Sequence, residues 1–150
     1  MKRAAWLVIL TGLLLGARFQ SDDAVKKEVE KFQGSWIATS LEANGQKAPE
    51  EQVKLYRITF SGDKYVEKLA EQTIEEGTQK LDPAKKPKTM DITITQGAQK
   101  GEMQLAIYEI EGDTLKICAA QAGSKDRPTD FTAKAGSDRL LIILKKEKTK

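Results

Sequence analysis

The sequence predicts a mainly β protein, built as a small antiparallel meander barrel with a short N-terminal helix before it. Apolar and polar residues alternate over about nine short segments, which is the period of half-buried strands. Turn residues such as Asn44-Gly45 and Glu111-Gly112-Asp113 separate these segments. No helical pattern of roughly 10 to 15 residues lies between them, which argues against a parallel α/β sheet. Such a meander hides its apolar face by closing into a barrel or folding into a sandwich, and we predict the barrel.

The N-terminal segment has the order of a secretory signal peptide. Lys2 and Arg3 precede an apolar run of about 14 residues, from Ala4 to Ala17, that ends in small residues. The run is shorter than the roughly 20 residues of a membrane-spanning helix, and it holds no cysteine for a lipid anchor. We therefore predict a signal peptide over residues 1–21 and a single exported domain over residues 22–150, periplasmic or secreted. No stable membrane anchor is expected after cleavage, and an uncleaved anchor is the alternative.

Composition argues against several classes of function. Residues 1–17 contain two of the 25 basic residues and none of the 22 acidic ones, so the rest of the chain has a net charge of only +1. Nucleic-acid binding needs clustered positive charge, so we predict no nucleic-acid partner. The lack of histidine removes the usual general base and transition-metal ligand, and one cysteine cannot form an intramolecular disulfide. We expect no metal, no cofactor and no enzymatic activity, and we expect a monomer.

The first element is a helix over residues 22–33, because Val29 and Phe32 lie on one face at helical spacing. Two acidic residues, Asp22 and Asp23, are placed to favour its N-terminus. After the helix, the apolar period changes from helical to alternating, which marks the start of the strands.

The clearest strand covers residues 89–95, where Met90, Ile92 and Ile94 share one face and polar residues occupy the other. The remaining strands are predicted over residues 35–42, 53–60, 64–69, 73–81, 102–110, 114–120, 129–134 and 139–145. The residues predicted to be mostly buried are Trp36, Ile92, Ile94, Leu115, Ile117, Leu140 and Ile142.

The tripeptide Gly34-Ser35-Trp36 follows the helix and resembles the G-x-W signature of lipocalins. In lipocalins this tryptophan packs at the closed end of the barrel, often against an arginine, so the resemblance implies that Arg139 or Arg127 stacks on Trp36. The alternative is an ordinary core tryptophan. Longer segments, residues 32–36, 81–88, 91–94, 107–118 and 127–131, resemble a family of small exported lipocalin-like domains of planctomycete bacteria. That family has no assigned activity, so the resemblance implies a fold and export but no reaction. The paired cysteines of many lipocalins are missing.

Three residues form the predicted ligand site: Tyr108, Cys118 and Arg127. The loop 122–128 is expected to join the strand of Cys118 to a strand bearing Phe131, which would place Arg127 at a barrel mouth. There its guanidinium could orient an anionic head group, with Tyr108 and an apolar interior nearby. The alternatives are that Arg127 pairs with a neighbouring aspartate, Asp126 or Asp130, and that Cys118 is a small packing residue.

Neighbouring carboxylates, Glu50-Glu51, Glu75-Glu76 and Glu109 with Glu111, are read as surface groups and not as a catalytic pair. The sequence therefore favours an exported, non-enzymatic binding module for a small amphipathic or anionic ligand. The alternative is a protein-interaction or inhibitor module of the cell envelope that acts through the loops 82–88 and 122–128. The predicted partner is thus an unknown small molecule or an envelope protein.

Overall fold

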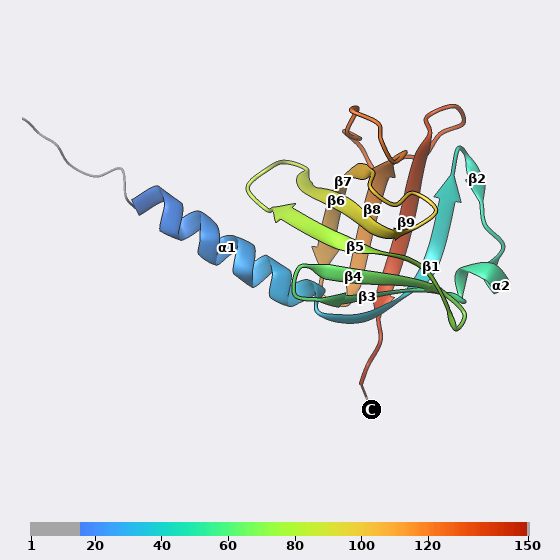
Figure 1. The fold of residues 1–150 in the computed structure, drawn as a ribbon, viewed down its shortest axis with the longest axis horizontal. Helices are drawn as coiled ribbons and strands as arrows, with labels where there is room; N and C mark the ends of the chain where they lie inside the picture. The colour runs from blue at the N-terminus through green and yellow to red at the C-terminus, as the bar shows by residue number, and fades with distance from the viewer. Residues whose placement is uncertain (1–15, 150) are drawn as a thin grey trace, which may run out of the picture.

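The computed structural model describes residues 16–149 and confirms the predicted fold class. It is a closed antiparallel barrel of eight strands preceded by a helix (Figure 1). The elements in chain order are α1 (Gly16–Phe32), β1 (Gly34–Ala43), β2 (Gln46–Lys47), α2 (Glu50–Val53), β3 (Tyr56–Ser61), β4 (Lys64–Leu69), β5 (Gln72–Asp82), β6 (Lys88–Gly97), β7 (Met103–Glu111), β8 (Thr114–Ala120) and β9 (Arg139–Lys146).

The barrel closes because β9 pairs with β8 on one side and with β1 on the other. Each strand from β3 to β8 pairs with its neighbours in the barrel order. The two-residue β2 extends β1 as a hairpin, and both turn residues, Asn44 and Gly45, have positive φ, at 49° and 77°. These values fit the tight turn that an Asn-Gly pair favours.

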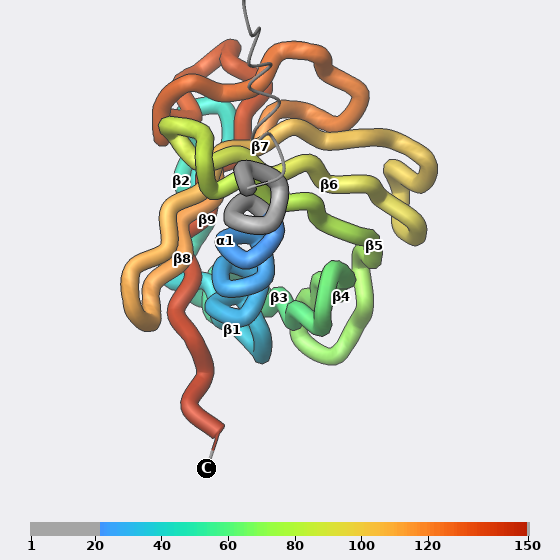
Figure 2. The backbone as a smooth tube through the Cα atoms, turned by 90° about the vertical axis from the view of Figure 1, so that its left-hand side faces the viewer, coloured from blue at the N-terminus to red at the C-terminus, as the bar shows by residue number. Residues whose placement is uncertain are grey.

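Helix α1 begins at Gly16, six residues before the predicted start. Asp22 and Asp23 therefore lie inside the helix and do not form its N-terminus, because residues 17–21 contain no proline or glycine to stop the helix there. Figure 1 shows α1 projecting from the barrel, and Figure 2 shows it in front of one barrel end. No helix in the described part of the chain is both long and apolar enough to cross a membrane. Most of the predicted signal peptide, residues 1–15, lies outside the described residues.

The barrel end next to α1, which we call the base, is filled by large side chains. Phe32 at the end of α1 makes edge-to-face contacts with Phe60 and Tyr108, at ring-centroid distances of 5.2 and 5.1 Å. All three rings are buried, as are Leu115 and Leu144. The helix thus inserts an aromatic plug into the base, and packing of this kind supplies most of the stability of a barrel without disulfides.

Trp36 lies in the same packed base and is fully buried. Its indole N–H donates to the backbone carbonyl of Phe32 at 2.7 Å, which fixes the corner between α1 and β1. The cation over the indole ring is the Lys146 ammonium, 5.2 Å from the ring centre. The expectation that Arg139 or Arg127 stacks there is wrong, because both guanidinium groups are bound to aspartates, Arg139 to Asp130 and Arg127 to Asp91.

Of the seven residues predicted to form the core, five are buried and two, Ile92 and Leu140, are partly buried. The predicted strand over residues 129–134 is wrong, since this segment has no strand structure. Strands β8 and β9 pair directly with each other, so the segment between them finds no free strand edge to join. Val53 belongs to α2 and not to a strand, and β2 and α2 are additional elements.

The connection between β8 and β9, residues 121–138, packs on the outer face of the barrel wall, where Thr132 contacts Cys118 and Arg127 binds Asp91. Ile107, Cys118 and Ala120 point outward from β7 and β8, yet all three are buried. Pro128 and Ala133 of the connection are buried as well. This wall therefore has a packed layer on its outer face in addition to the barrel interior.

Candidate functional site at the open end of the barrel

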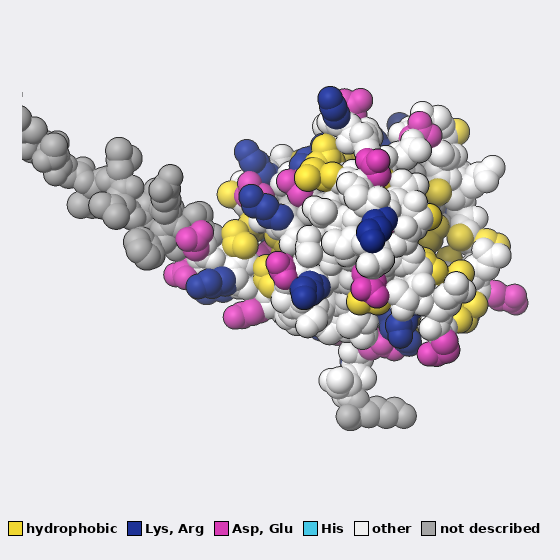
Figure 3. Space-filling model, viewed as in Figure 1, with side chains coloured by type: hydrophobic (Ala, Val, Ile, Leu, Met, Phe, Trp, Pro, Cys, Tyr) yellow, Lys and Arg dark blue, Asp and Glu magenta, His cyan; other side chains and the backbone are white. Residues whose placement is uncertain are grey.

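The two ends of the barrel differ in exposure. At the base most inward-facing side chains are buried, with Ile110 as an exception. At the opposite end more inward-facing side chains remain part-exposed, namely Leu41, Tyr56, Glu67, Glu75 and Leu140. Inward-facing side chains of a closed barrel reach solvent only through an end. We call this end the open end. Leu55 and Leu69 beside it are 50% and 44% exposed, and hydrophobic side chains reach the surface on the right of Figure 3, the side that carries α2.

Two carboxylates face each other inside the open end. Glu67 of β4 lies directly opposite Glu75 of β5 and opposite the buried core residue Ile58 of β3, so both glutamate side chains point to the interior. Like charges placed directly across a strand pair destabilise a sheet. This pairing therefore lowers stability, as is common where a fold maintains a binding or reactive site.

Each carboxylate accepts a hydrogen bond from a phenol, one from the buried Tyr65 and one from the partly buried Tyr56. The Tyr65 hydroxyl donates to Glu75 Oε1 at 2.7 Å, and the Tyr56 hydroxyl donates to Glu67 Oε2. Burial raises the pKa of both phenols, and the carboxylates raise it further, so both tyrosines stay protonated donors. The four groups form two phenol–carboxylate pairs on three adjacent strands.

Burial raises the pKa of Glu67 to about 7; the hydrogen bond from Tyr56 opposes this rise, and the charge of Glu75 adds to it. At neutral pH Glu67 therefore carries a proton in roughly half of the molecules. A carboxyl group in this state can accept a hydrogen bond, donate one, or pair with a cation.

Gly77 provides the space for this arrangement. It lies opposite Tyr65 in the register, and a Cβ atom at position 77 would lie 2.7 Å from the Tyr65 ring and 2.2 Å from the Thr93 carbonyl oxygen. Both distances are shorter than a real Cβ contact. Only glycine lets the Tyr65 ring lie against β5 and reach Glu75.

Arg127 lies outside the barrel wall, over β6 and β7. Its guanidinium donates to the backbone carbonyls of Met90 at 3.1 Å and Ala106 at 2.7 Å, and it pairs with the Asp91 carboxylate. The expected hairpin that would bring it to a mouth does not form, since Phe131 is not on a strand. The partner is Asp91 and neither of the aspartates considered from the sequence. These contacts fasten the β8–β9 connection to the wall.

The structure does not bring the other two predicted site residues to Arg127. Tyr108 is buried at the base, where its hydroxyl donates to Glu28 Oε1 at 3.2 Å. Cys118 is buried on the outer face of the wall, and its thiol contacts the Thr132 carbonyl at 3.5 Å. Burial raises the pKa of the Cys118 thiol, although Arg139 partly opposes this, whereas a nucleophilic cysteine needs a lowered pKa. Tyr108, Cys118 and Arg127 thus sit in three separate environments.

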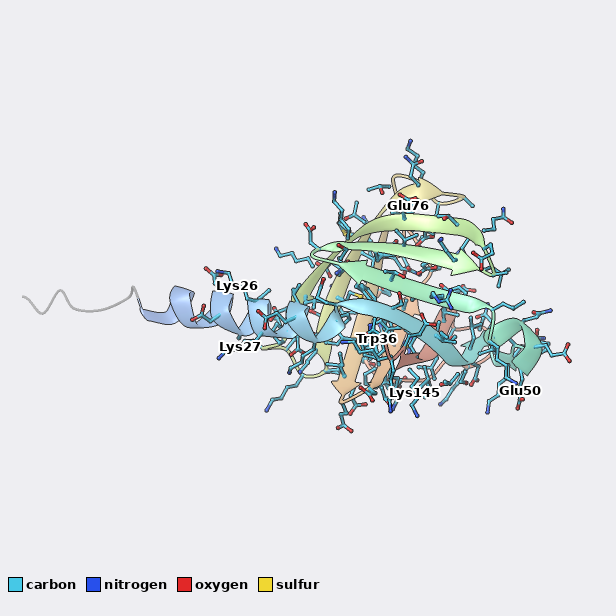
Figure 4. The ribbon with its side chains drawn as sticks, turned by 90° about the horizontal axis from the view of Figure 1, so that it is seen from below. Lys26, Lys27, Trp36, Glu50, Glu76 and Lys145 are labelled. Atoms are coloured by element: carbon cyan, nitrogen blue, oxygen red, sulfur yellow. The ribbon has the colours of Figure 1, made fainter. Side chains whose placement is uncertain are left out.

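The neighbouring glutamates Glu75 and Glu76 are also separated, on opposite faces of β5. Glu75 faces Glu67, while Glu76 is exposed on the outer surface (Figure 4). Sequence reasoning missed Tyr56, Tyr65 and Glu67. One signal was present: Glu67 shares its strand face with Tyr65, so placing that tyrosine inside would also have placed the glutamate inside.

The comparisons with known proteins add no further information on the site. No family model, no curated protein and no solved structure matches this chain.

Proposed function

We propose that this protein is a non-enzymatic binding module whose barrel receives a small amphipathic ligand at the open end. The observation that carries the proposal is the inward-facing pair Glu67 and Glu75 beside part-exposed apolar side chains. Ligand sites combine an apolar wall with a few convergent polar groups, and they often lie in the mouths of barrels. Leu41 and Leu140 supply such a wall, and the carboxylates supply the polar groups.

The carboxylates favour a ligand with a cationic head, such as an alkylammonium. Among the described residues no lysine or arginine forms an ion pair with Glu67 or Glu75, so the negative charge of the site is balanced only by phenol hydrogen bonds. A ligand ammonium would add charge-assisted hydrogen bonds to both carboxylates. An anionic ligand would instead meet like charge here. Export of the module to the periplasm or beyond remains a prediction from residues 1–21.

Binding of decylammonium and of decanoate, measured by isothermal titration calorimetry at pH 7.5, tests the proposal. We expect decylammonium to bind more tightly than decanoate. Glu67→Gln and Glu75→Gln should each weaken decylammonium binding by about tenfold or more, since each removes a charged partner worth about 1.5 to 3 kcal/mol. Glu76→Gln removes the same charge from the outer surface and should leave the affinity unchanged.

Two results would contradict the proposal. One is tighter binding of decanoate than of decylammonium. The other is an equal loss of affinity in Glu67→Gln and Glu76→Gln, which would show that only overall charge matters and that the open end is not the site.

A further inference from the structure

A pocket lies at the base of the barrel, on the opposite end from the carboxylate pair. Its volume is about 330 Å³. The β5–β6 loop (residues 83–87) and Lys88 at the start of β6 form one side, residues 108–111 at the end of β7 form the floor, and Phe131 from the β8–β9 connection forms the far side. The pocket thus joins three segments that are distant in the sequence.

The walls of this pocket are largely apolar. Ile110 and Phe131 are part-exposed toward it, and the rings of Pro83 and Pro87 line the loop side. The loop is held in shape by the backbone N–H of Ala84, which donates to the Asp82 carboxylate at 3.1 Å. Proline rings also restrict the backbone of the loop, so little entropy is lost when a ligand is bound against it.

Three lysines, Lys85, Lys86 and Lys88, line the loop side of this pocket. Lys88 is already bound to Glu28 at 2.6 Å, but Lys85 and Lys86 are exposed and form no ion pair with any residue that the structure describes. On the acidic side of the rim, Glu109 is paired with Lys116, which leaves Glu111. Two uncommitted cations therefore face one uncommitted carboxylate, and the pocket carries a positive excess.

We propose that this pocket binds a small organic acid with an aromatic or aliphatic body. The acid group lies between Lys85 and Lys86, and the body lies on Phe131 and Ile110. Carboxylate, sulfonate and phosphate share the chemistry that lysine ammonium groups recognise. A volume of about 330 Å³ is at the small end of ligand pockets, so the ligand is a compact molecule. This site is independent of the cation-selective open end.

Three probes separate the contribution of the acid group from that of the apolar part of the ligand: 2-naphthoate, the neutral 2-naphthalenemethanol and inorganic phosphate. Each is titrated by calorimetry, and amide NMR shifts locate its binding site. We expect 2-naphthoate to bind about tenfold more tightly than the neutral alcohol and more tightly than phosphate alone. Its shifts should map to residues 83–88, 108–111 and Phe131. Tighter binding of phosphate than of 2-naphthoate would instead indicate an anion site that does not bind an apolar group, and it would overturn the proposal.

Variants test the assigned residues. Lys85→Ala combined with Lys86→Ala should weaken 2-naphthoate binding about tenfold, and Glu111→Gln should strengthen it about twofold. Lys100→Ala removes one positive charge at the distant β6–β7 turn and should change nothing. Binding of decylammonium at the open end should be unaffected in the double lysine variant, so failure of one site is separable from failure of the other. An unchanged 2-naphthoate affinity in the double variant, or shifts confined to β4 and β5, would overturn the proposal.

Discussion

The pKa of a glutamate in this barrel depends on whether a cation lies beside it, as Glu28 and Glu67 show. Glu28, almost fully buried, receives the Lys31 and Lys88 ammonium groups and the Tyr108 hydroxyl. Burial opposes the ionisation of Glu28, but the two lysines outweigh it and hold its pKa below the ordinary value. Burial also opposes the ionisation of Glu67, but among the described residues no cation pairs with it, and its pKa therefore moves in the opposite direction.

The pKa of Glu67 makes stability depend on pH. Its folded value of about 7 exceeds the ordinary value of 4.5, so the folded state holds more protons than the unfolded state between these values. The free energy of unfolding should therefore fall as pH rises from about 5 to 7.5. The contribution of Glu28 has the opposite sign, but it is lost only below about pH 4.5.

Urea denaturation from pH 5 to 8 measures this slope. Glu67→Gln should flatten it, because the amide does not titrate, whereas Glu76→Gln should leave it as in the unaltered protein. If the slope is the same in both variants, Glu67 does not titrate in this range and its burial has no such consequence.

The contacts of Arg127 predict a structural role. Arg127→Ala should lower the free energy of unfolding by about 2 kcal/mol, since it removes hydrogen bonds from a charged donor to two carbonyls and a carboxylate. Lys125→Ala, in the same connection but exposed, should cost less than about 0.5 kcal/mol. Decylammonium binding should be equal in both variants. Lost binding with unchanged denaturation would instead restore Arg127 as a ligand residue.

Among the elements, α1 contacts the barrel through its last turns, as far as its side chains are described, from Asp22 onward. Its described contacts begin near Val25 and end at Phe32, and Glu28 is the polar centre of this attachment. Glu28→Ala should therefore loosen the helix while the barrel stays folded. Hydrogen exchange should become faster for the amides of residues 25–32, with little change in β6 and β8. Glu30→Ala on the same helix is exposed and serves as the control. Equal exchange in the two variants would show that the aromatic plug alone holds α1.

The elements also show how far the sequence could be used for prediction. The strands β4 and β8 have the predicted bounds, because alternation over a whole strand reports which face is buried. Residues 129–134 alternate equally well, but a local pattern does not reveal whether a strand edge is free. Glu67 was missed for a related reason: β4 has apolar residues on both faces, with Tyr65 on one and Val66 on the other, so the inward face was ambiguous.

In the molecule as a whole, the two ends of one barrel have opposite chemical character. The base is packed by an aromatic plug and bordered by lysines, while the open end carries two carboxylates among apolar side chains. Closure of β9 onto β1 gives every barrel strand two partners. The eight barrel strands therefore hold both ends on one frame and leave no outermost barrel strand, while the two-residue β2 is paired on one side with β1.

The double layer around β8 changes which substitutions this strand can accept. Four successive residues, Ile117, Cys118, Ala119 and Ala120, are buried, because the barrel interior covers one face and the β8–β9 connection covers the other. A strand with one solvent-exposed face tolerates substitutions at every second position. Here no position in that run tolerates a larger side chain without cost. Three of the four side chains are small, because a larger one would displace the packed layer that its face contacts. Among homologous sequences, the four consecutive residues 117–120 of β8 should therefore vary little. In β6, substitutions should instead concentrate at every second residue, on the outward face.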